Sequence, residues 1–369
     1  MFSSHTLRRT GCALLVVLSN TSIAETMSLD KKMQLSAVHH GLAPHVVIRA
    51  SNGDLIVAGS NNELGYRPWA TRISPNGDVR WEFVEGESDK SADRSIPQQQ
   101  FSAVIELPDQ TTVFCGMISK DKRSMVILDH LNLDGSMINQ LLVAPARPLT
   151  IASCARWQGG IALAGSVFGQ PQGTGWLAKI NAELTFEWEK YDDSYANSDI
   201  METDGGTLTV ITWSGSINYL AKIAPSGDVL VRSKPLPEGD YKLVHTASIS
   251  STVEIVGTSS SSTMNTQFLQ FDDQLRGPNW SVKLHNVGIK KCLALADGSI
   301  AIFGSQFHNG ATAAVTRIYK DGSFKGFLVE PPYRSPWYED ATLTGNKNEV
   351  AAVRSVGPGQ AVLDWISFK

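Results

Sequence analysis

Short apolar runs separated by polar turns follow one another along almost the whole chain. The run Ile161–Ser166 is continuous and ends in Gly-Ser, and a Gly/Pro/Gln-rich loop, a second run at Trp176–Ile180, a turn and a third run at Phe186–Trp188 come after it. A strand with one wet face alternates between apolar and polar residues, whereas a strand buried on both faces does not. The first run is therefore predicted to be a strand that is covered on both faces.

The same group of elements recurs about seven times. The runs that correspond to Ile161–Ser166 are Leu55–Ser60, Val113–Met117, Leu208–Ser214, Val253–Ser259, Ile300–Ser305 and Val350–Ser355. Each is preceded by another strand and a turn, and most are followed by a hairpin whose turn carries Asn-Gly, Asp-Gly or Ser-Gly, residues that tolerate a positive φ. A period of roughly 50 residues is typical of the four-stranded blades of a β-propeller.

The repeat predicts an all-β fold, a seven-bladed β-propeller of four-stranded antiparallel blades that forms one domain over residues 25–369. A single core of this length would be unusually large, but in a repeat architecture each unit contacts only its neighbours. The seventh unit lacks a fourth strand, because Ala361–Phe368 is the last strand before Lys369. We expect an N-terminal strand at Lys32–Val38 to complete this blade, which would close the ring and pair an exposed edge.

The N-terminal residues have the pattern of an export signal. Arg8 and Arg9 precede the short apolar run Cys12–Leu18, and Ser22–Ala24 fits a small-x-small cleavage site. The apolar run is too short to span a bilayer, which favours a cleaved signal peptide, residues 1–24, over an N-terminal anchor helix. We therefore expect a periplasmic or secreted protein without a membrane span.

Composition narrows the range of partners. The chain is 42% hydrophobic and 18% charged, as in globular proteins, and its formal net charge is −4. Broad nucleic-acid binding needs a basic surface, so no nucleic-acid partner is expected. A monomer that binds a protein partner is the expected state.

Three cysteines remain after the proposed leader, namely Cys115, Cys154 and Cys292. Each falls within a predicted strand, and an odd number leaves at least one free thiol. One interpretation is that all three are small buried core residues. The other is a disulfide between Cys115 and Cys154 in adjacent repeats, which an exported location would permit.

The best-formed repeat, carried by Gly160–Ser166, Trp176–Ile180 and Phe186–Trp188, resembles the repeats of bacterial secreted β-propellers and is similar to the quinoprotein-like type. The resemblance covers nearly the whole mature chain and implies a propeller fold without implying an activity. Quinoprotein repeats usually carry Asp-x-x-Thr-Gly before the tryptophan, whereas Pro75–Gly77 and Pro225–Gly227 stand in the turns here. No quinone or other cofactor is therefore expected.

Motifs for catalysis or metal binding are absent from the sequence, which contains no G-x-S-x-G elbow, phosphate loop, H-E-x-x-H or paired C-x-x-C. The adjacent pair His39–His40 is interpreted as part of a solvated loop. Carboxylates at Asp192–Asp193 and Glu339–Asp340 are the pairs that could meet across a central channel. Tryptophans on the fourth strands, Trp81, Trp188 and Trp280, are expected to pack between blades.

Two long connections lie on the face where functional loops of a propeller gather. Residues Glu85–Gln100 are polar, whereas Pro331–Asp340 are aromatic and proline-rich. Tyrosine, tryptophan and arginine are typical of binding hot spots. The candidate partner-binding residues are Tyr66, Arg67, Lys122, Arg123, Trp213, His308, Tyr333, Arg334, Trp337 and Tyr338. In the alternative interpretation, Trp337 and Tyr338 fill the last groove between blades.

These patterns favour an exported non-enzymatic scaffold that binds a protein partner through its loop face, for example a periplasmic inhibitor, an immunity protein or an assembly factor. The alternative is an extracytoplasmic enzyme that acts on glycans or other polymers at the central channel. Titratable groups clustered in a deep central pocket would favour the enzyme. An aromatic and basic loop face without such a cluster would favour the scaffold.

Overall fold

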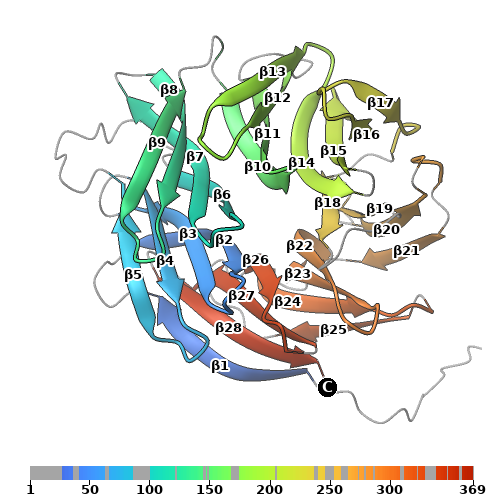
Figure 1. The fold of residues 1–369 in the computed structure, drawn as a ribbon. Coiled ribbons are helices and arrows are strands. Elements are labelled where there is room, and N and C mark those ends of the chain that lie inside the picture. Colours follow the sequence, from blue (N-terminus) through green and yellow to red (C-terminus); the bar gives the residue numbers. More distant parts are fainter. Residues whose placement is uncertain are drawn as a thin grey trace, which may run out of the picture.

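The computed structural model describes residues 27–35, 41–62, 66–85, 100–120, 123–143, 147, 149–167, 174–203, 206–236, 240–245, 253–258, 265–272, 274–277, 280–285, 287–307, 311–321, 323–328, 338–346, 348–356 and 360–368. The expected leader, residues 1–24, lies outside these ranges. Within them, 28 β-strands are arranged around a central axis (Figure 1). No helix that could cross a membrane is found in this part of the chain.

The strands are β1 (Met27–Leu35), β2 (Leu42–Arg49), β3 (Leu55–Asn61), β4 (Arg67–Ile73), β5 (Val79–Val84), β6 (Gln100–Glu106), β7 (Thr112–Lys120), β8 (Arg123–Leu131), β9 (Met137–Val143), β10 (Leu149–Trp157), β11 (Gly160–Val167), β12 (Thr174–Ile180), β13 (Phe186–Asp192), β14 (Ala196–Thr203), β15 (Thr207–Ser214), β16 (Ile217–Ile223), β17 (Val229–Arg232), β18 (Asp240–His245), β19 (Val253–Thr258), β20 (Asn265–Phe271), β21 (Trp280–His285), β22 (Val287–Ala294), β23 (Ile300–Phe307), β24 (Ala311–Ile318), β25 (Phe324–Leu328), β26 (Tyr338–Leu343), β27 (Glu349–Ser355) and β28 (Ala361–Phe368).

Six sheets surround the axis. Four of them are sequential meanders, β2–β5, β6–β9, β10–β13 and β14–β17; a fifth has the order β1-β28-β27-β26, and the sixth contains eight strands in the order β21-β20-β19-β18-β22-β23-β24-β25. The innermost strands β2, β6, β10, β14, β18, β22 and β26 each contact the next one around the axis, and β26 contacts β2. The described residues therefore form a ring of sheets.

The prediction of seven separate four-stranded blades is wrong, because the structure has six sheets. Strand β18 pairs with β19 only as far as Leu243 and then pairs in parallel with β22, where Val244 lies opposite Cys292 and His245 opposite Leu293. This pairing merges two of the expected units into one hydrogen-bonded sheet. A repeat in the sequence identifies strands within a unit but does not report hydrogen bonds between units.

The N-terminal strand also differs from the expected one. Strand β1 runs antiparallel to β28, with Met27 opposite Phe368 and Leu35 opposite Ala361. It therefore begins five residues before the expected segment Lys32–Val38, of which the last three residues lie outside the described ranges.

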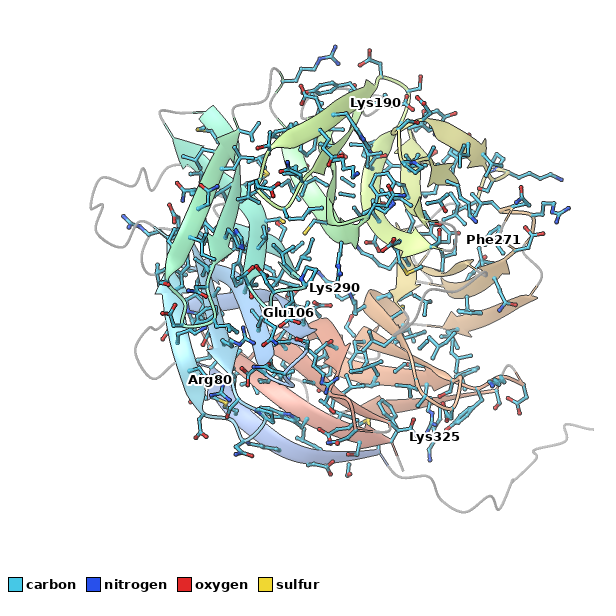
Figure 2. All side chains as sticks on the ribbon, in the orientation of Figure 1. Arg80, Glu106, Lys190, Phe271, Lys290 and Lys325 are labelled. Carbon is cyan, nitrogen blue, oxygen red and sulfur yellow. The ribbon has the colours of Figure 1, made fainter. Side chains whose placement is uncertain are left out.

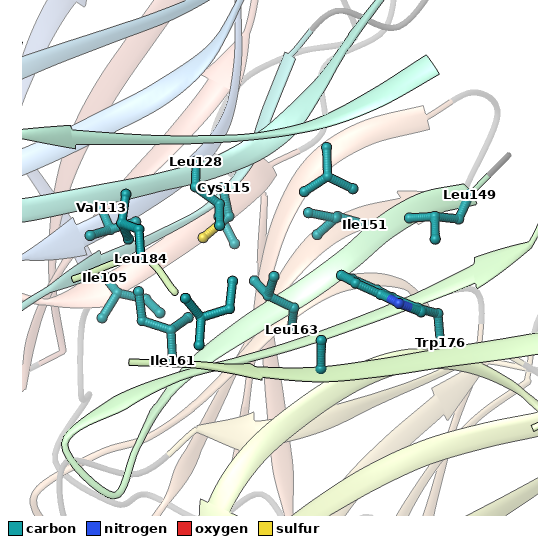
Figure 3. Packing of buried hydrophobic residues seen from close by; sticks show 14 of the residues in the cluster. Ile105, Val113, Cys115, Leu128, Leu149, Ile151, Ile161, Leu163, Trp176 and Leu184 are labelled. Atoms are coloured by element: carbon teal, nitrogen blue, oxygen red, sulfur yellow. The ribbon is translucent and has the colours of Figure 1, made fainter. Parts of the chain in front are cut away.

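The apolar runs bury their side chains between neighbouring sheets, as the lack of alternation predicts. Every residue of β3, β4 and β12 is buried. Figure 3 shows one of the clusters, in which Val113 and Leu128 from one sheet meet Ile161, Leu163 and Trp176 from the next. Side chains from two sheets interdigitate here, so each sheet depends on its neighbour for the burial of its apolar face.

The fourth-strand tryptophans pack between sheets, which confirms the prediction for Trp81 and Trp188. The indole Nε1 of Trp81 donates to the Leu133 carbonyl oxygen at 3.0 Å, and Trp188 donates to the Pro225 carbonyl oxygen at 3.1 Å. Each indole ring also lies against a glycine of the turn whose carbonyl oxygen it contacts. At Gly135, for example, a Cβ atom would come within 2.8 Å of the Trp81 ring, and φ is +82°. The side chain of Trp280 is not among those described.

In several four-strand units, a polar residue on the third strand (β4, β8 or β24) contacts the turn between the first and second strands and holds it in place. The buried Arg72 donates to Asp54 at 2.8 Å, His130 contacts the Thr111 hydroxyl at 2.7 Å, and Arg317 donates to the Ser299 hydroxyl at 2.8 Å. Buried charges persist only when they are paired and hydrogen-bonded. These groups therefore belong to the frame of the propeller and not to its sites.

Candidate functional site

The structure places the ten candidate binding residues in different surroundings. Tyr66 is exposed (44%) with φ +59°, and Trp213 is half-buried at the end of β15. Arg67 is buried in β4. Tyr338 is also buried, where it donates to Asp364 at 3.0 Å. Positions outside the described residues are Lys122, His308, Tyr333, Arg334 and Trp337, and the side chain of Arg123 is likewise not described.

Tyr338 fills the space between two sheets, because its ring packs edge-on against Phe303 of β23 at 5.7 Å between centroids. This position agrees with the alternative interpretation, in which it fills a groove between blades. Neither Tyr338 nor Arg67 presents a side chain to a partner in this conformation.

The sheet that contains Trp213 also carries a group of aromatic and basic side chains that we call the tyrosine–arginine cluster, formed by Tyr195, Tyr219 and Arg232. Tyr219 pairs with Thr212, the residue before Trp213, so the side chains of Tyr219 and Trp213 point to opposite faces of this sheet. The guanidinium carbon of Arg232 lies 3.8 Å from the centroid of the Tyr195 ring, and Tyr195 meets Tyr219 edge-on at 5.3 Å. Trp213 is paired with Ala196 of β14, the residue after Tyr195, so it lies at the same end of this sheet. The cluster therefore lies on the face that holds the loops between second and third strands.

A groove of about 320 Å³ runs beside the cluster between β13 and the strands β15–β17. Its apolar lining includes Leu177, Ala221 and Ile223. Two ion pairs cross it: Arg232 donates to Asp192 at 2.7 Å, and Lys190 donates to Asp228 at 2.6 Å. An apolar floor with a polar rim is the arrangement found in many protein–protein interfaces.

Asp192 and Asp193 therefore lie at this outer groove, away from the channel lining, in contrast to the prediction that they could meet another carboxylate across the channel. Asp193 forms an exposed ion pair with Arg147 at 2.6 Å, and Arg147 lies 5.4 Å from the centroid of the Tyr191 ring. Their charges hold arginines near aromatic rings on the loop face.

Sequence reasoning identified Trp213 but missed Tyr195, Tyr219 and Arg232. These residues are separated by up to 37 positions, and each belongs to a different strand or turn of the sheet β14–β17. The concentration of tyrosines between Tyr191 and Tyr219 was an available signal. Only the pairing of the strands shows that they meet at one end.

The central channel contains a second cavity, of about 450 Å³. It is lined by residues from all of the innermost strands named above. In six of these strands the register shifts by one residue, which leaves His45, Ser102, Ala152, Ser198, Lys290 and Glu339 as the extra residues. A β-bulge changes the direction of a side chain, and most of these six extra residues are polar.

Glu339 and Asp340 do line the channel, where they meet lysines. The Lys290 ammonium lies 3.4 Å from Glu339, and the Lys291 ammonium lies 3.5 Å from Asp340. Asp340 also accepts the backbone N–H of Val47 at 2.8 Å. Burial raises the pKa of the Asp340 carboxyl, and the Lys291 charge opposes this shift.

Asp199 occupies an equivalent position in β14. It accepts the backbone N–H of Leu243 at 3.0 Å and the hydroxyl of Ser153 at 3.1 Å, so it ties three innermost strands together. His45 is largely buried in the channel, and this burial lowers its pKa. The described residues contain no cluster of ligands suited to a metal ion.

No family model matches the chain, and no curated protein matches it. Among solved structures it is similar to the WD40 β-propeller domain of Doa1, with a TM-score of 0.60 and 11% identity over 93% of this chain and 97% of that one. It is also similar to Raptor from Chaetomium thermophilum (TM-score 0.55, 11% identity, 90% of this chain and 28% of that one). A protein of unknown function from Dyadobacter fermentans is a third neighbour (TM-score 0.50, 11% identity, 93% and 99%).

These likenesses show that the fold of the chain is a β-propeller. At 11% identity they show the fold alone, and propellers host many unrelated functions. The function must therefore be argued from the sites of this chain.

Proposed function

We propose that this protein is an exported, non-enzymatic β-propeller scaffold that binds a protein partner through its loop face. The observation that carries the proposal is the tyrosine–arginine cluster, whose Arg232 lines an apolar groove between two sheets. The proposed export is supported by the leader pattern in residues 1–24.

The cluster has the properties of a binding hot spot. Tyrosine, tryptophan and arginine are the residues most enriched among such positions, and tyrosine loses little side-chain entropy when it is held. The ion pair of Arg232 with Asp192 and its stacking on Tyr195 hold the guanidinium in one orientation. A preorganised surface reduces the entropy lost on binding.

The expected partner is a folded protein that inserts an apolar side chain into the groove. Ile217, which is 43% exposed on the same end of the sheet, would extend the apolar contact beyond the groove. An inhibitor or immunity protein for an envelope-active toxin and an assembly factor are two versions of this function, and both would use the same face.

The competing enzyme hypothesis is favoured by one observation, the convergence of His45, Lys290 and Glu339 on the channel. However, Asp199 and Asp340 each accept backbone N–H bonds from a neighbouring innermost strand. Two of the three channel carboxylates therefore serve the frame, which makes the loop face the better-supported site.

The test is a pull-down from envelope extract with residues 25–369. A variant that carries Tyr195→Ala, Tyr219→Ala and Arg232→Ala should lose the partner, because each hot-spot truncation typically costs more than about 1 kcal/mol. A matched control carries Phe324→Ala and Lys325→Ala, two exposed residues of β25, and should retain it. Circular dichroism and thermal melting establish that both variants are folded.

The readout is the stoichiometric recovery of one protein, identified by mass spectrometry. Recovery by the wild type and the control, but not by the cluster variant, is the expected result. Equal recovery by all three proteins would refute this face as the interface, and the absence of any partner would refute the scaffold function.

A further inference from the structure

The channel cavity carries its cations on one side. Lys242 of β18 and Lys290 and Lys291 of β22 line it, and these two strands are neighbours in the ring. Lys290 remains 46% exposed, and Figure 2 places it at the central opening of the ring. In the described part of the chain no carboxylate lies within ion-pair distance of the Lys242 ammonium.

Two of the lysines lie within ion-pair distance of channel carboxylates. The separations of 3.4 Å for Lys290 and 3.5 Å for Lys291 exceed the roughly 2.7–2.9 Å of a charge-assisted hydrogen bond. Each ammonium has three donors, so it can bind a ligand oxygen in addition to a carboxylate. Asp340 and Asp199, by contrast, are held by backbone N–H groups and cannot follow the lysines.

The lining residues of β6 and β10 carry no charge, and apart from Val104 and Ile151 they are small or polar. They include Gln100, Ser102 and Ala103 of β6 and Ala152 and Ser153 of β10. Small side chains leave space in front of the lysines, and the hydroxyl and amide groups can hydrogen-bond polar atoms of a ligand. A cavity of about 450 Å³ lies within the range of small-molecule sites.

We propose that the central channel is a binding site for a small organic molecule that carries an oxyanion, either a carboxylate or a phosphate ester. Lys242 and Lys290 hold the oxyanion, and the Ser102 and Gln100 side chains contact the uncharged part of the molecule. The site is separate from the loop face, so it stands or falls independently of the proposed protein partner.

The experiment is isothermal titration calorimetry at low and fixed ionic strength. Citrate and glucose 6-phosphate are the two charged probes, and glucose is the uncharged one. The wild type should bind at least one charged probe saturably at up to millimolar concentrations and should not bind glucose. Citrate alone or glucose 6-phosphate alone would identify the carboxylate or the phosphate as the recognised group.

Lys242→Met and Lys290→Met should each weaken binding at least about tenfold, because each removes one contact to the charged group. Lys325→Met, at an exposed position on β25, is the matched control and should leave the affinity unchanged. Melting temperatures show whether the channel variants remain folded, and Lys290→Arg, which retains the charge, should bind.

Three outcomes would overturn the proposal. The first is no saturable binding of either charged probe. The second is wild-type affinity in both channel variants, which would place the ligand elsewhere. The third is an equal loss in the Lys325→Met control, which would show that binding depends on the overall charge and not on the channel.

Discussion

Replacing Asp129 by asparagine should remove part of the pH dependence of stability between about pH 5 and pH 8. Asp129 lies fully buried in β8, where its Oδ1 accepts a hydrogen bond from the Gln140 amide at 2.8 Å. The same amide contacts the Glu85 carboxylate at 3.2 Å, which brings two carboxyl groups close together. Burial, with a further contribution from the Glu85 charge, raises the pKa of Asp129 to about 8.

The sign follows from proton binding. Between the ordinary pKa of 3.8 and about 8, the folded protein holds a proton on Asp129 that the unfolded chain has lost. The contribution of this group to stability is therefore complete below the ordinary pKa and is lost as the pH rises through the folded one. At about 1.4 kcal/mol per pH unit, a rise of two units inside this window lowers the free energy of unfolding by about 2.7 kcal/mol.

The loss can be followed by thermal melting. Unfolding entropies of about 2.1 cal/mol/K per residue convert 2.7 kcal/mol into a fall of about 4 °C for a chain of this size. The melting temperatures of the wild type and Asp129→Asn should therefore converge toward acidic pH and separate toward pH 8, with the variant the more stable. Burial lowers the pKa of His45 and of His130, and a lowered histidine pKa makes the free energy of unfolding rise with pH. Both histidines are present in the wild type and in the variant, so their contributions cancel in the difference.

Two further variants separate the causes. Glu85→Gln removes the neighbouring charge but not the burial, so it should lower the folded pKa of Asp129 and end the loss of stability at a lower pH without abolishing that loss. Glu183→Gln makes the same chemical change at an exposed turn and should leave the slope unchanged. The reasoning fails if Asp129→Asn shows the same pH dependence as the wild type.

Two other predictions concern buried contacts. The Cys115 and Cys154 sulfur atoms lie 3.0 Å apart on adjacent sheets, so oxidised glutathione should accept two electrons from the two thiols and leave a disulfide that peptide mapping detects. The disulfide should add up to about 4 kcal/mol to the free energy of unfolding by the loop-entropy argument. Failure of the two cysteines to link in the folded protein would contradict the contact. Arg354 donates to the buried Asp364 at 2.5 Å. Arg354→Met should cost about 3–5 kcal/mol in chemical denaturation, because it leaves the buried carboxylate with the Tyr338 hydroxyl but without its ion-pair partner. A cost below about 1 kcal/mol would contradict this account of the ion pair.

The repeating strands could be predicted because their chemistry is local. Continuous apolar runs such as Ile161–Ser166 report burial on both faces, and turns such as Asn76–Gly77 provide a residue that accepts positive φ. The same repeat predicted that the fourth-strand tryptophans Trp81 and Trp188 pack between sheets. The candidate site was predicted only in part, because Trp213 is recognisable at the end of its strand but Tyr195, Tyr219 and Arg232 come from other elements of the same sheet.

The sequence by itself thus determined the four-stranded unit, the buried faces and the class of fold. The tertiary structure alone decided that β18 pairs with β22, which gives six sheets instead of seven blades. It also decided that Lys242 and Lys290 share one side of the channel and that Tyr195, Tyr219 and Arg232 meet on one face. Local patterns specify which side of a strand is buried, whereas contacts between units depend on how the sheets are placed around the axis.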